Sequence, residues 1–117
     1  MFKVIIAGGR DFEDYLKLKL HCDKILSNIT DDIEVVCGGA RGADFLGKQY
    51  AIERGYSVKL FKADWDRFGK SAGMIRNKEM AEYSDAAICF WDGKSRGTSN
   101  MIELSKKYGL KLRIVKY

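Results

Sequence analysis

The sequence contains no proline, one histidine and three cysteines, and the scarcity of the last two argues against a metal site. Cys22, Cys37 and Cys89 form no close pair and do not have metal-ligand spacing. We therefore expect them to be buried thiols of a reduced compartment, with no bound metal. His21 lies among polar positions of a predicted helix, which favours a solvated surface residue over a catalytic one. Nothing in the sequence indicates a resident cofactor.

Long hydrophobic runs are also absent, since no apolar stretch approaches the roughly 20 residues that a membrane-spanning helix needs. The first apolar run is too short for a signal peptide and leads directly into patterned structure. We therefore expect a cytoplasmic protein without membrane contact. With 117 residues, of which 46% are apolar and 32% charged, the sequence predicts one globular domain over residues 1–117.

An excess of acid is missing as well: 21 basic residues against 16 acidic ones give a net charge of +5. This balance suits anionic partners without saying which. The arginines are more informative than the total, because Arg10, Arg41 and Arg96 lie in glycine-containing segments. The basic residues near the end alternate with apolar ones, which is typical of an edge strand with a solvated lysine face.

Apolar runs alternate with helical patterns along the whole chain. Strands are predicted over 2–7, 33–37, 57–61, 86–91 and 110–115, and helices over 12–28, 43–54, 72–83 and 99–108. Asp11 is the predicted N-cap of the first helix, and 62–71 is predicted to be a polar connecting loop. Because several strands are continuously apolar, this order indicates an α/β protein whose mostly parallel sheet is covered on both faces.

Glycine and arginine recur together after three of these strands, in the segments 8–11, 38–42 and 92–98. Glycine lets the backbone approach a ligand closely, helix N-termini favour anions, and arginine offers a planar fork to a phosphate. Each segment alone could be an ordinary tight turn. In a parallel sheet, however, all three would open onto one edge, and this repetition favours a phosphate-binding cleft.

Taken together, the motifs resemble those of a known family. They are Gly8-Gly9-Arg10, Cys37-Gly38-Gly39-Ala40-Arg41-Gly42-Ala43-Asp44, Ala63-Asp64-Trp65, Gly69, Ala72-Gly73, Arg76-Asn77, Met80, Trp91-Asp92-Gly93 and Gly97-Thr98. This set is similar to the small Rossmann-like proteins of the SLOG superfamily, in particular its YspA-related branch (DUF2493). The resemblance implies a three-layer αβα sandwich with strand order 3-2-1-4-5, a nucleotide-derived ligand, and a dimer or higher homo-oligomer. Leu16 and Leu20, beside the main stripe of the first helix, could meet such a partner or extend the core.

The LOG-type phosphoribohydrolases of that superfamily allow a comparison by position. Arg76 matches an arginine that positions ribose and phosphate in those enzymes, and Gly97-Thr98 matches their phosphate-binding Gly-Thr. Where the enzymes have a pair of glutamates, one of them catalytic, this chain has Asn100 and Met101. Glu103 is displaced by two residues, or roughly 200° on a helix. Binding without turnover is therefore favoured over hydrolysis.

We thus expect a protein that senses or sequesters a nucleotide-derived small molecule, in a sharper form an ADP-ribose-type or cyclic nucleotide signal of antiphage defence. Two alternatives stay open: an N-glycosidase that uses Asp44, Asp92 or Glu103, and a single-stranded nucleic-acid binding module. Trp65, Phe68 and Trp91 could stack on a base or pack into the core. The predicted ligand-binding residues are Gly8, Gly9, Arg10, Gly38, Gly39, Arg41, Gly42, Asp44, Trp65, Arg76, Asn77, Trp91, Asp92, Gly93, Ser95, Arg96, Gly97, Thr98 and Asn100.

Overall fold

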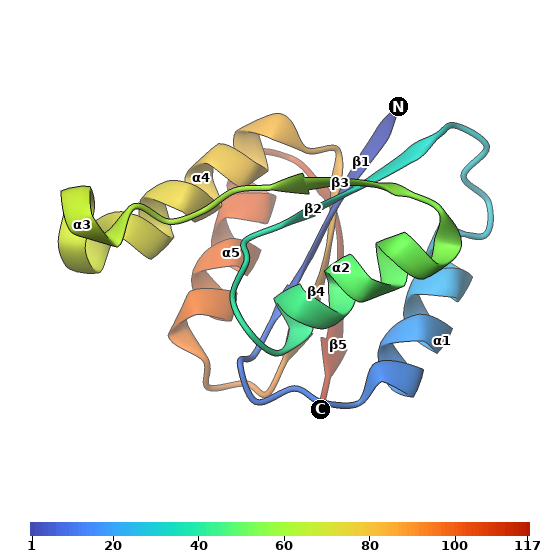
Figure 1. Ribbon diagram of the computed structural model, residues 1–117, viewed down its shortest axis with the longest axis horizontal. Helices are drawn as coiled ribbons and strands as arrows, with labels where there is room; N and C mark the ends of the chain where they lie inside the picture. The colour runs from blue at the N-terminus through green and yellow to red at the C-terminus, as the bar shows by residue number, and fades with distance from the viewer.

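A computed structural model describes residues 1–117 and shows one five-stranded sheet between two layers of helices (Figure 1). The strands are β1 (Phe2–Gly8), β2 (Ile33–Cys37), β3 (Ser57–Leu60), β4 (Ala86–Trp91) and β5 (Lys111–Lys116). The helices are α1 (Tyr15–Leu26), α2 (Ala43–Arg54), α3 (Trp65–Phe68), α4 (Ala72–Tyr83) and α5 (Arg96–Lys107), with a 3₁₀ turn at Gly69–Ser71. All pairings are parallel and the order is β3-β2-β1-β4-β5. The predicted Rossmann-like α/β fold and its strand order are confirmed.

The sheet separates two apolar cores, because side chains of successive strand residues point to opposite faces. One core lies under α1 and α2 and includes Val4, Ile6 and Tyr50. The other lies under α4 and α5 and includes Ile5, Met80 and Met101. The central strand β1 is therefore buried on both faces, as its unbroken apolar run predicts. Because β1 pairs in parallel with both β2 and β4, the carboxyl ends of the three strands lie at one edge of the sheet.

The first helix begins three residues later than its sequence pattern suggests. Asp14, and not Asp11, is its N-cap, since the Asp14 Oδ1 accepts a hydrogen bond of 3.0 Å from the Lys17 N–H. Before it, the Phe12 N–H donates to the Gly9 carbonyl at 3.2 Å in a tight turn that buries Phe12 in the core. This turn leaves Asp11 in the loop after β1 and makes the predicted cap wrong.

Two other segments differ from the predicted boundaries. The polar connection over 62–71 contains the short helix α3, whose cap Asp64 accepts from the Arg67 N–H at 3.1 Å, and the 3₁₀ turn. In Figure 1, α3 lies at the end of the molecule, away from the sheet. Helix α5 begins at Arg96 and not near Ser99, because Ser95 is its N-cap. Arg96, Gly97 and Thr98 therefore occupy the first turn of a helix.

Leu16 and Leu20 are 65% and 63% exposed, so they do not extend the core. His21 is half-buried, and the three cysteines are buried free thiols. Burial raises the pKa of the Cys37 thiol to about 11, which keeps it protonated near neutral pH. None of the helices has both the length and the apolar character required to cross a membrane.

Candidate functional site

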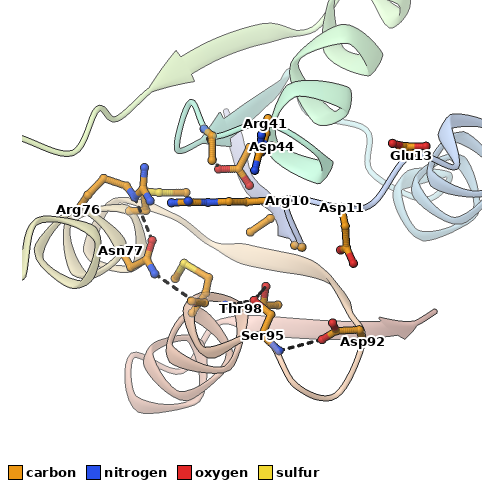
Figure 2. A pocket seen from close by; sticks show the side chains of 17 residues that line it. Arg10, Asp11, Glu13, Arg41, Asp44, Arg76, Asn77, Asp92, Ser95 and Thr98 are labelled. Carbon is orange, nitrogen blue, oxygen red and sulfur yellow. Dashed lines mark hydrogen bonds between the residues drawn. The ribbon is translucent and has the colours of Figure 1, made fainter. Parts of the chain in front are cut away.

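A cavity of about 660 Å³ opens at the edge of the sheet where β1, β2 and β4 end (Figure 2). In doubly wound sheets this is the edge at which ligands bind. It brings together eleven of the predicted ligand residues from segments far apart in the sequence: Gly8, Gly9, Arg10, Arg41, Asp44, Arg76, Asn77, Asp92, Ser95, Gly97 and Thr98. The three loops therefore do converge, as the parallel sheet predicts.

A second cavity of about 450 Å³ adjoins the first on the side of β3 and α3. Gly38, Gly39 and Trp65 line it, together with Leu60, Lys62 and Ala63, which were not among the predicted ligand-binding residues. The two cavities share Arg10, Ala40, Arg41 and Arg76 in their walls, so they form two lobes of one cleft. We call them the main lobe and the side lobe.

Five predicted ligand residues line neither lobe, and most of them have a structural role. Gly42, with φ of 79°, is the N-cap of α2 and contacts the loop after β1, where a Cβ would come within 2.3 Å of the Gly9 carbonyl. The half-buried Trp91 donates its Nε1–H to the Ser95 carbonyl at 3.1 Å. Asn100 accepts a hydrogen bond of 3.0 Å from Asn77. Gly93 has φ of 86° in the turn after β4, and Arg96 is exposed on α5.

Of the three carboxylates considered for catalysis, two line the main lobe. Glu103 is exposed on α5 and lies outside both lobes. The Asp92 Oδ1 accepts from the backbone N–H groups of Lys94 and Ser95 at 2.8 Å each, and these hydrogen bonds lower the pKa of Asp92. Asp92 thus shapes its turn and remains ionised. No three acidic, histidine or cysteine side chains gather closely enough to hold a metal ion.

Asp44 is the most unusual acid of the cleft, because it is only 7% exposed and has no ion-pair partner. Burial raises its pKa to about 6, although the Arg76 charge and backbone N–H groups around it partly oppose this rise. The Ala40 N–H donates to Asp44 Oδ2 at 3.4 Å, and the N–H groups of Gly38 and Gly8 also stabilise the carboxylate. The hydrogen bond from Ala40 therefore ties Asp44 to the loop after β2.

Arg76 reaches the cleft from the first turns of α4. It donates one N–H to the Gly38 carbonyl, and its Nε–H donates to the Asn77 Oδ1 at 3.0 Å. Asn77 in turn donates to Asn100 and, at 3.4 Å, to the Gly97 carbonyl, which links α4 to α5. Burial and the neighbouring Arg10 charge lower the pKa of Arg76, whereas Asp44 raises it. Figure 2 shows the Arg10 side chain extending across the main lobe toward Arg76.

Gly38 is required between Arg76 and Asp44. A Cβ at this position would lie 2.6 Å from an Arg76 nitrogen and 2.9 Å from the Asp44 Oδ2. Any side chain would therefore push the arginine and the carboxylate away from the wall of the cleft. The absence of a Cβ at Gly38 therefore lets the Arg76 and Asp44 side chains pack closely against the backbone of this loop.

The first turn of α5 lines part of the main lobe through Gly97 and Thr98. The Ser95 Oγ caps the helix at the Thr98 N–H, at 3.4 Å, and lies 3.1 Å from the Thr98 hydroxyl. The N–H groups of Arg96 and Gly97 have no backbone acceptor. Free donors at a helix N-terminus favour a negatively charged group.

Several lining residues were not predicted from the sequence to contact a ligand, including Asp11, Glu13, Ala40 and Met101 of the main lobe. Tyr117, whose side chain contacts the loop after β1, was not predicted either. The Tyr117 hydroxyl donates to the Asp11 Oδ1 at 2.7 Å, and its ring packs edge-on against Phe12 with centroids 4.8 Å apart. Asp11 could have been noticed because it follows Gly8-Gly9-Arg10 directly, whereas no local signal connects Tyr117 with a loop 106 residues away.

Comparison with known proteins gives one family and one fold. Residues 2–68 match the family model YAcAr, described as the YspA, cpYpsA-related SLOG family. The Gene 61 protein of Mycobacterium phage D29 is 34% identical over 116 residues, covering 94% of this chain and 93% of that protein.

Two solved structures have the same fold. DNA processing protein A from Helicobacter pylori, studied for its single-stranded DNA binding mode, superposes with a TM-score of 0.73 at 19% identity. The match covers 97% of this chain and 64% of that protein. The structural-genomics target TM1055 superposes with a TM-score of 0.69 at 18% identity, covering 96% of this chain and 72% of that one. Identities this low show a common fold alone.

Proposed function

Since the chain belongs to the YspA, cpYpsA-related SLOG family, we propose that it binds a nucleotide-derived small molecule in the two-lobed cleft without turning it over. The observation that carries this proposal is the convergence of Arg10, Arg41 and Arg76 on the wall that the two lobes share. The ion pairs of the structure lie elsewhere, on α1 and α2, so these guanidinium groups have no carboxylate partner within 4 Å. Gathering like charges is unfavourable unless an anion joins them.

The hydrogen-bonding groups around the arginines suit the rest of a nucleotide. Free N–H groups at the start of α5 can take a phosphate oxygen, and Asp11, Glu13 and Asp92 can accept from ribose hydroxyls or base amino groups. The same set offers no pairing of a nucleophile with a base, and the position of the LOG-type glutamates holds Asn100, which is hydrogen-bonded to Asn77. These features support binding over cleavage.

A finer form of the proposal is that the ligand is a signalling nucleotide of antiphage defence, of the ADP-ribose or cyclic type. It is supported by the 34% identical protein of a bacteriophage, since a phage gains from removing such a signal. Release of intact ligand from the purified protein would identify the compound. Binding of ordinary mononucleotides without binding of any cyclic or ADP-ribose compound would contradict the signalling nucleotide and leave the general proposal intact.

One observation favours a second function, an N-glycosidase with Asp44 as the acid or base. A buried carboxyl in a cleft with a pKa of about 6 is typical of groups that exchange protons near neutral pH. Free base that accumulates with time, and stops accumulating in Asp44→Asn, would establish this alternative.

The binding proposal is tested by isothermal titration with a panel of nucleotides against two charge-matched double variants. Arg10→Gln with Arg41→Gln removes two cations of the shared wall, and affinity should fall about 100-fold if each contributes about 1.4 kcal/mol. Lys107→Gln with Arg113→Gln removes two exposed cations outside both lobes and should leave affinity unchanged. Equal losses in both variants would mean that net charge, and not the cleft, attracts the ligand.

A further inference from the structure

The two lobes of the cleft differ in charge although they share a wall. The main lobe contains four acids, Asp11, Glu13, Asp44 and Asp92, beside its three arginines. The side lobe contains no acid, and Lys62 joins the same three arginines there. Anionic groups are therefore favoured on the shared wall, and the acidic part of the main lobe favours hydrogen-bond donors such as hydroxyl and amino groups.

The side lobe also presents an aromatic surface. Trp65 is 51% exposed and lines this lobe from α3. Its ring edge is supported by α4, because a Cβ at Gly73 would lie 3.4 Å from the Trp65 Cη2. Leu60 lies over Gly39 in the same lobe, where a Cβ would be 3.1 Å from its Cδ1. An exposed indole beside a basic wall provides a surface on which a base can stack next to a phosphate.

The volumes show that each lobe can hold a part of a ligand. At about 660 and 450 Å³, both lie within the range of roughly 300–1,000 Å³ that small-molecule sites occupy. A mononucleotide in the main lobe would leave Trp65 and Lys62 unused. A ligand whose phosphates cross the shared wall would reach both lobes at once.

We propose that the ligand consists of two ring-bearing halves joined through phosphates, with the phosphates on Arg10, Arg41 and Arg76 and the second ring stacked on Trp65. This inference rests on the proposed function and specifies the class of compound that the cleft takes. The first half lies in the main lobe, where the acids and Asn77 contact its sugar and base. The side lobe selects dinucleotide-type compounds over mononucleotides.

The test titrates the protein with the four ribonucleoside 5′-monophosphates and the four dinucleoside diphosphates in which two identical nucleosides are joined by a pyrophosphate. The preferred dinucleoside compound should bind at least tenfold more tightly than its monophosphate, since stacking on an aromatic side chain contributes about tenfold or more. Trp65→Ala should abolish this advantage and leave the affinity for the monophosphate unchanged. Phe68→Ala, which removes another exposed aromatic ring of α3 that lines neither lobe, should change neither affinity.

Fluorescence provides a second measurement in a Trp91→Phe variant, whose remaining tryptophan is Trp65. The dinucleoside diphosphate should quench this emission, and the monophosphate should leave it nearly unchanged. Equal affinity for both classes, with no effect of Trp65→Ala, would overturn the two-half ligand and leave the proposed function intact. Binding of none of the eight compounds would also overturn the two-half ligand. Only failure to bind the wider panel of nucleotides, ADP-ribose and cyclic derivatives would count against the proposed function itself. Affinity that increases steadily with the length of single-stranded oligonucleotides would indicate that the ligand is a nucleic acid and not a small molecule.

Discussion

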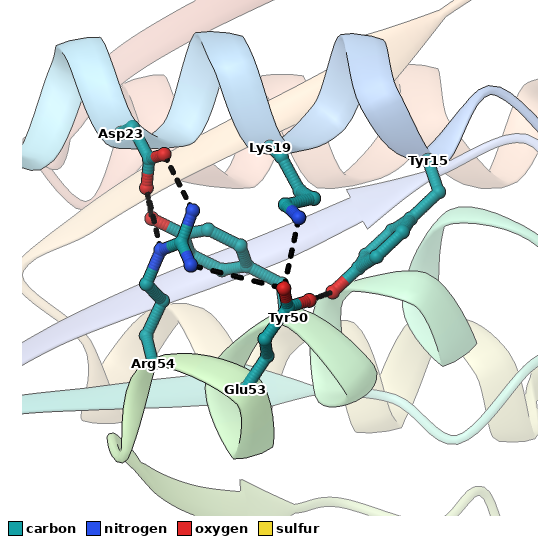
Figure 3. A network of polar contacts seen from close by, with 6 residues as sticks. All are labelled: Tyr15, Lys19, Asp23, Tyr50, Glu53 and Arg54. Atoms are coloured by element: carbon teal, nitrogen blue, oxygen red, sulfur yellow. Dashed lines mark hydrogen bonds and ion pairs between the residues drawn. The ribbon is translucent and has the colours of Figure 1, made fainter.

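The molecule carries two clusters of charged side chains that differ in how their charges are matched. Between α1 and α2, Lys19 pairs with Glu53 at 2.8 Å and Arg54 pairs with Asp23 at 2.7 Å (Figure 3). We call this set, which also includes Tyr15 and Tyr50, the helix clamp. In the cleft the arginines have no acidic partner, and the buried Asp44 has no cation in ion-pair contact.

We propose that the charges of the clamp have a structural role and those of the cleft a binding role. In the clamp, hydrogen bonds from Arg54 and Tyr50 lower the pKa of Asp23, and Lys19 lowers that of Glu53. In the cleft, burial raises the pKa of Asp44 and lowers that of Arg76, so both charges are held at a cost. Unmatched charges in a concave site are what a ligand of complementary charge would satisfy.

Asp44→Asn should give the largest change, which is a change in stability that depends on pH. The raised pKa of Asp44 makes ionisation of this group destabilising, whereas the lowered pKa values of Asp23 and Glu53 make ionisation stabilising in the clamp. Because the folded pKa of about 6 exceeds the ordinary 3.8, the folded state holds the extra proton between about pH 4 and 6. The cost of the ionised form is therefore full above pH 6 and disappears below pH 4. At about 1.4 kcal/mol per pKa unit, the variant should be about 3 kcal/mol more stable than wild type at pH 7 and about equal at pH 3.5. Urea unfolding at several pH values measures this difference, and a value independent of pH would contradict the burial argument.

Arg76→Gln should weaken ligand binding about 100-fold, since it removes a charge and hydrogen bonds worth roughly 2–3 kcal/mol. The Gln side chain is shorter and cannot reach Gly38 and a phosphate together. Titration calorimetry measures the loss. Arg76→Lys is the matched control, because it keeps the charge without the planar fork, and it should recover only part of the affinity. Full affinity in Arg76→Gln would exclude the shared wall as the anion site.

Arg54→Gln should give the reverse result, lowering the thermal midpoint by a few degrees and leaving ligand affinity unchanged. It breaks the exposed pairs with Asp23 and Glu53, and exposed ion pairs contribute little individually. Differential scanning fluorimetry with and without ligand separates the two readouts. A change in affinity as large as that of a cleft variant would erase the distinction between the clusters.

Tyr117→Phe and Tyr50→Phe make the smallest and most closely matched comparison, because each removes one hydroxyl that donates to an aspartate. Tyr117 donates to Asp11 of the cleft at 2.7 Å, and Tyr50 donates to Asp23 of the clamp at 2.6 Å. Tyr117→Phe should weaken binding about threefold by loosening the loop after β1, whereas Tyr50→Phe should change only stability, by about 1 kcal/mol. Identical effects of the two variants on both properties would contradict this division.

The fold was predictable because its signals are local and repeated. Continuous apolar strands alternating with helical stripes require a parallel sheet covered on both faces, and the structure confirms the sheet and its order. The predicted boundaries are wrong where the contacts of a few residues determine where a helix begins or whether it forms. The start of α1 depends on the buried turn at Phe12, and α3 has only four residues, too few to show a repeating helical pattern.

The site was predictable to the extent that topology determines it. The loops after β1, β2 and β4 meet because their strands are parallel neighbours, so Arg10, Arg41 and Asp44 converge. The side lobe was not predictable, because it depends on where α3 places Trp65 relative to Leu60. The side-chain contact between Tyr117 and Asp11 joins the last residue to the loop after β1 and has no sequence pattern.

The central claim is that the cleft binds its nucleotide-derived ligand without cleaving it. The most direct measurement is mass spectrometry of the free pool after the protein is mixed with nucleotides, ADP-ribose and cyclic and dinucleoside derivatives, before and after heating. If the cleft binds without cleavage, one compound should disappear from the free pool and return intact when heat unfolds the protein, and Arg76→Gln should no longer remove it. Free base that grows with time in the unheated sample would contradict the account and make Asp44 the residue to examine.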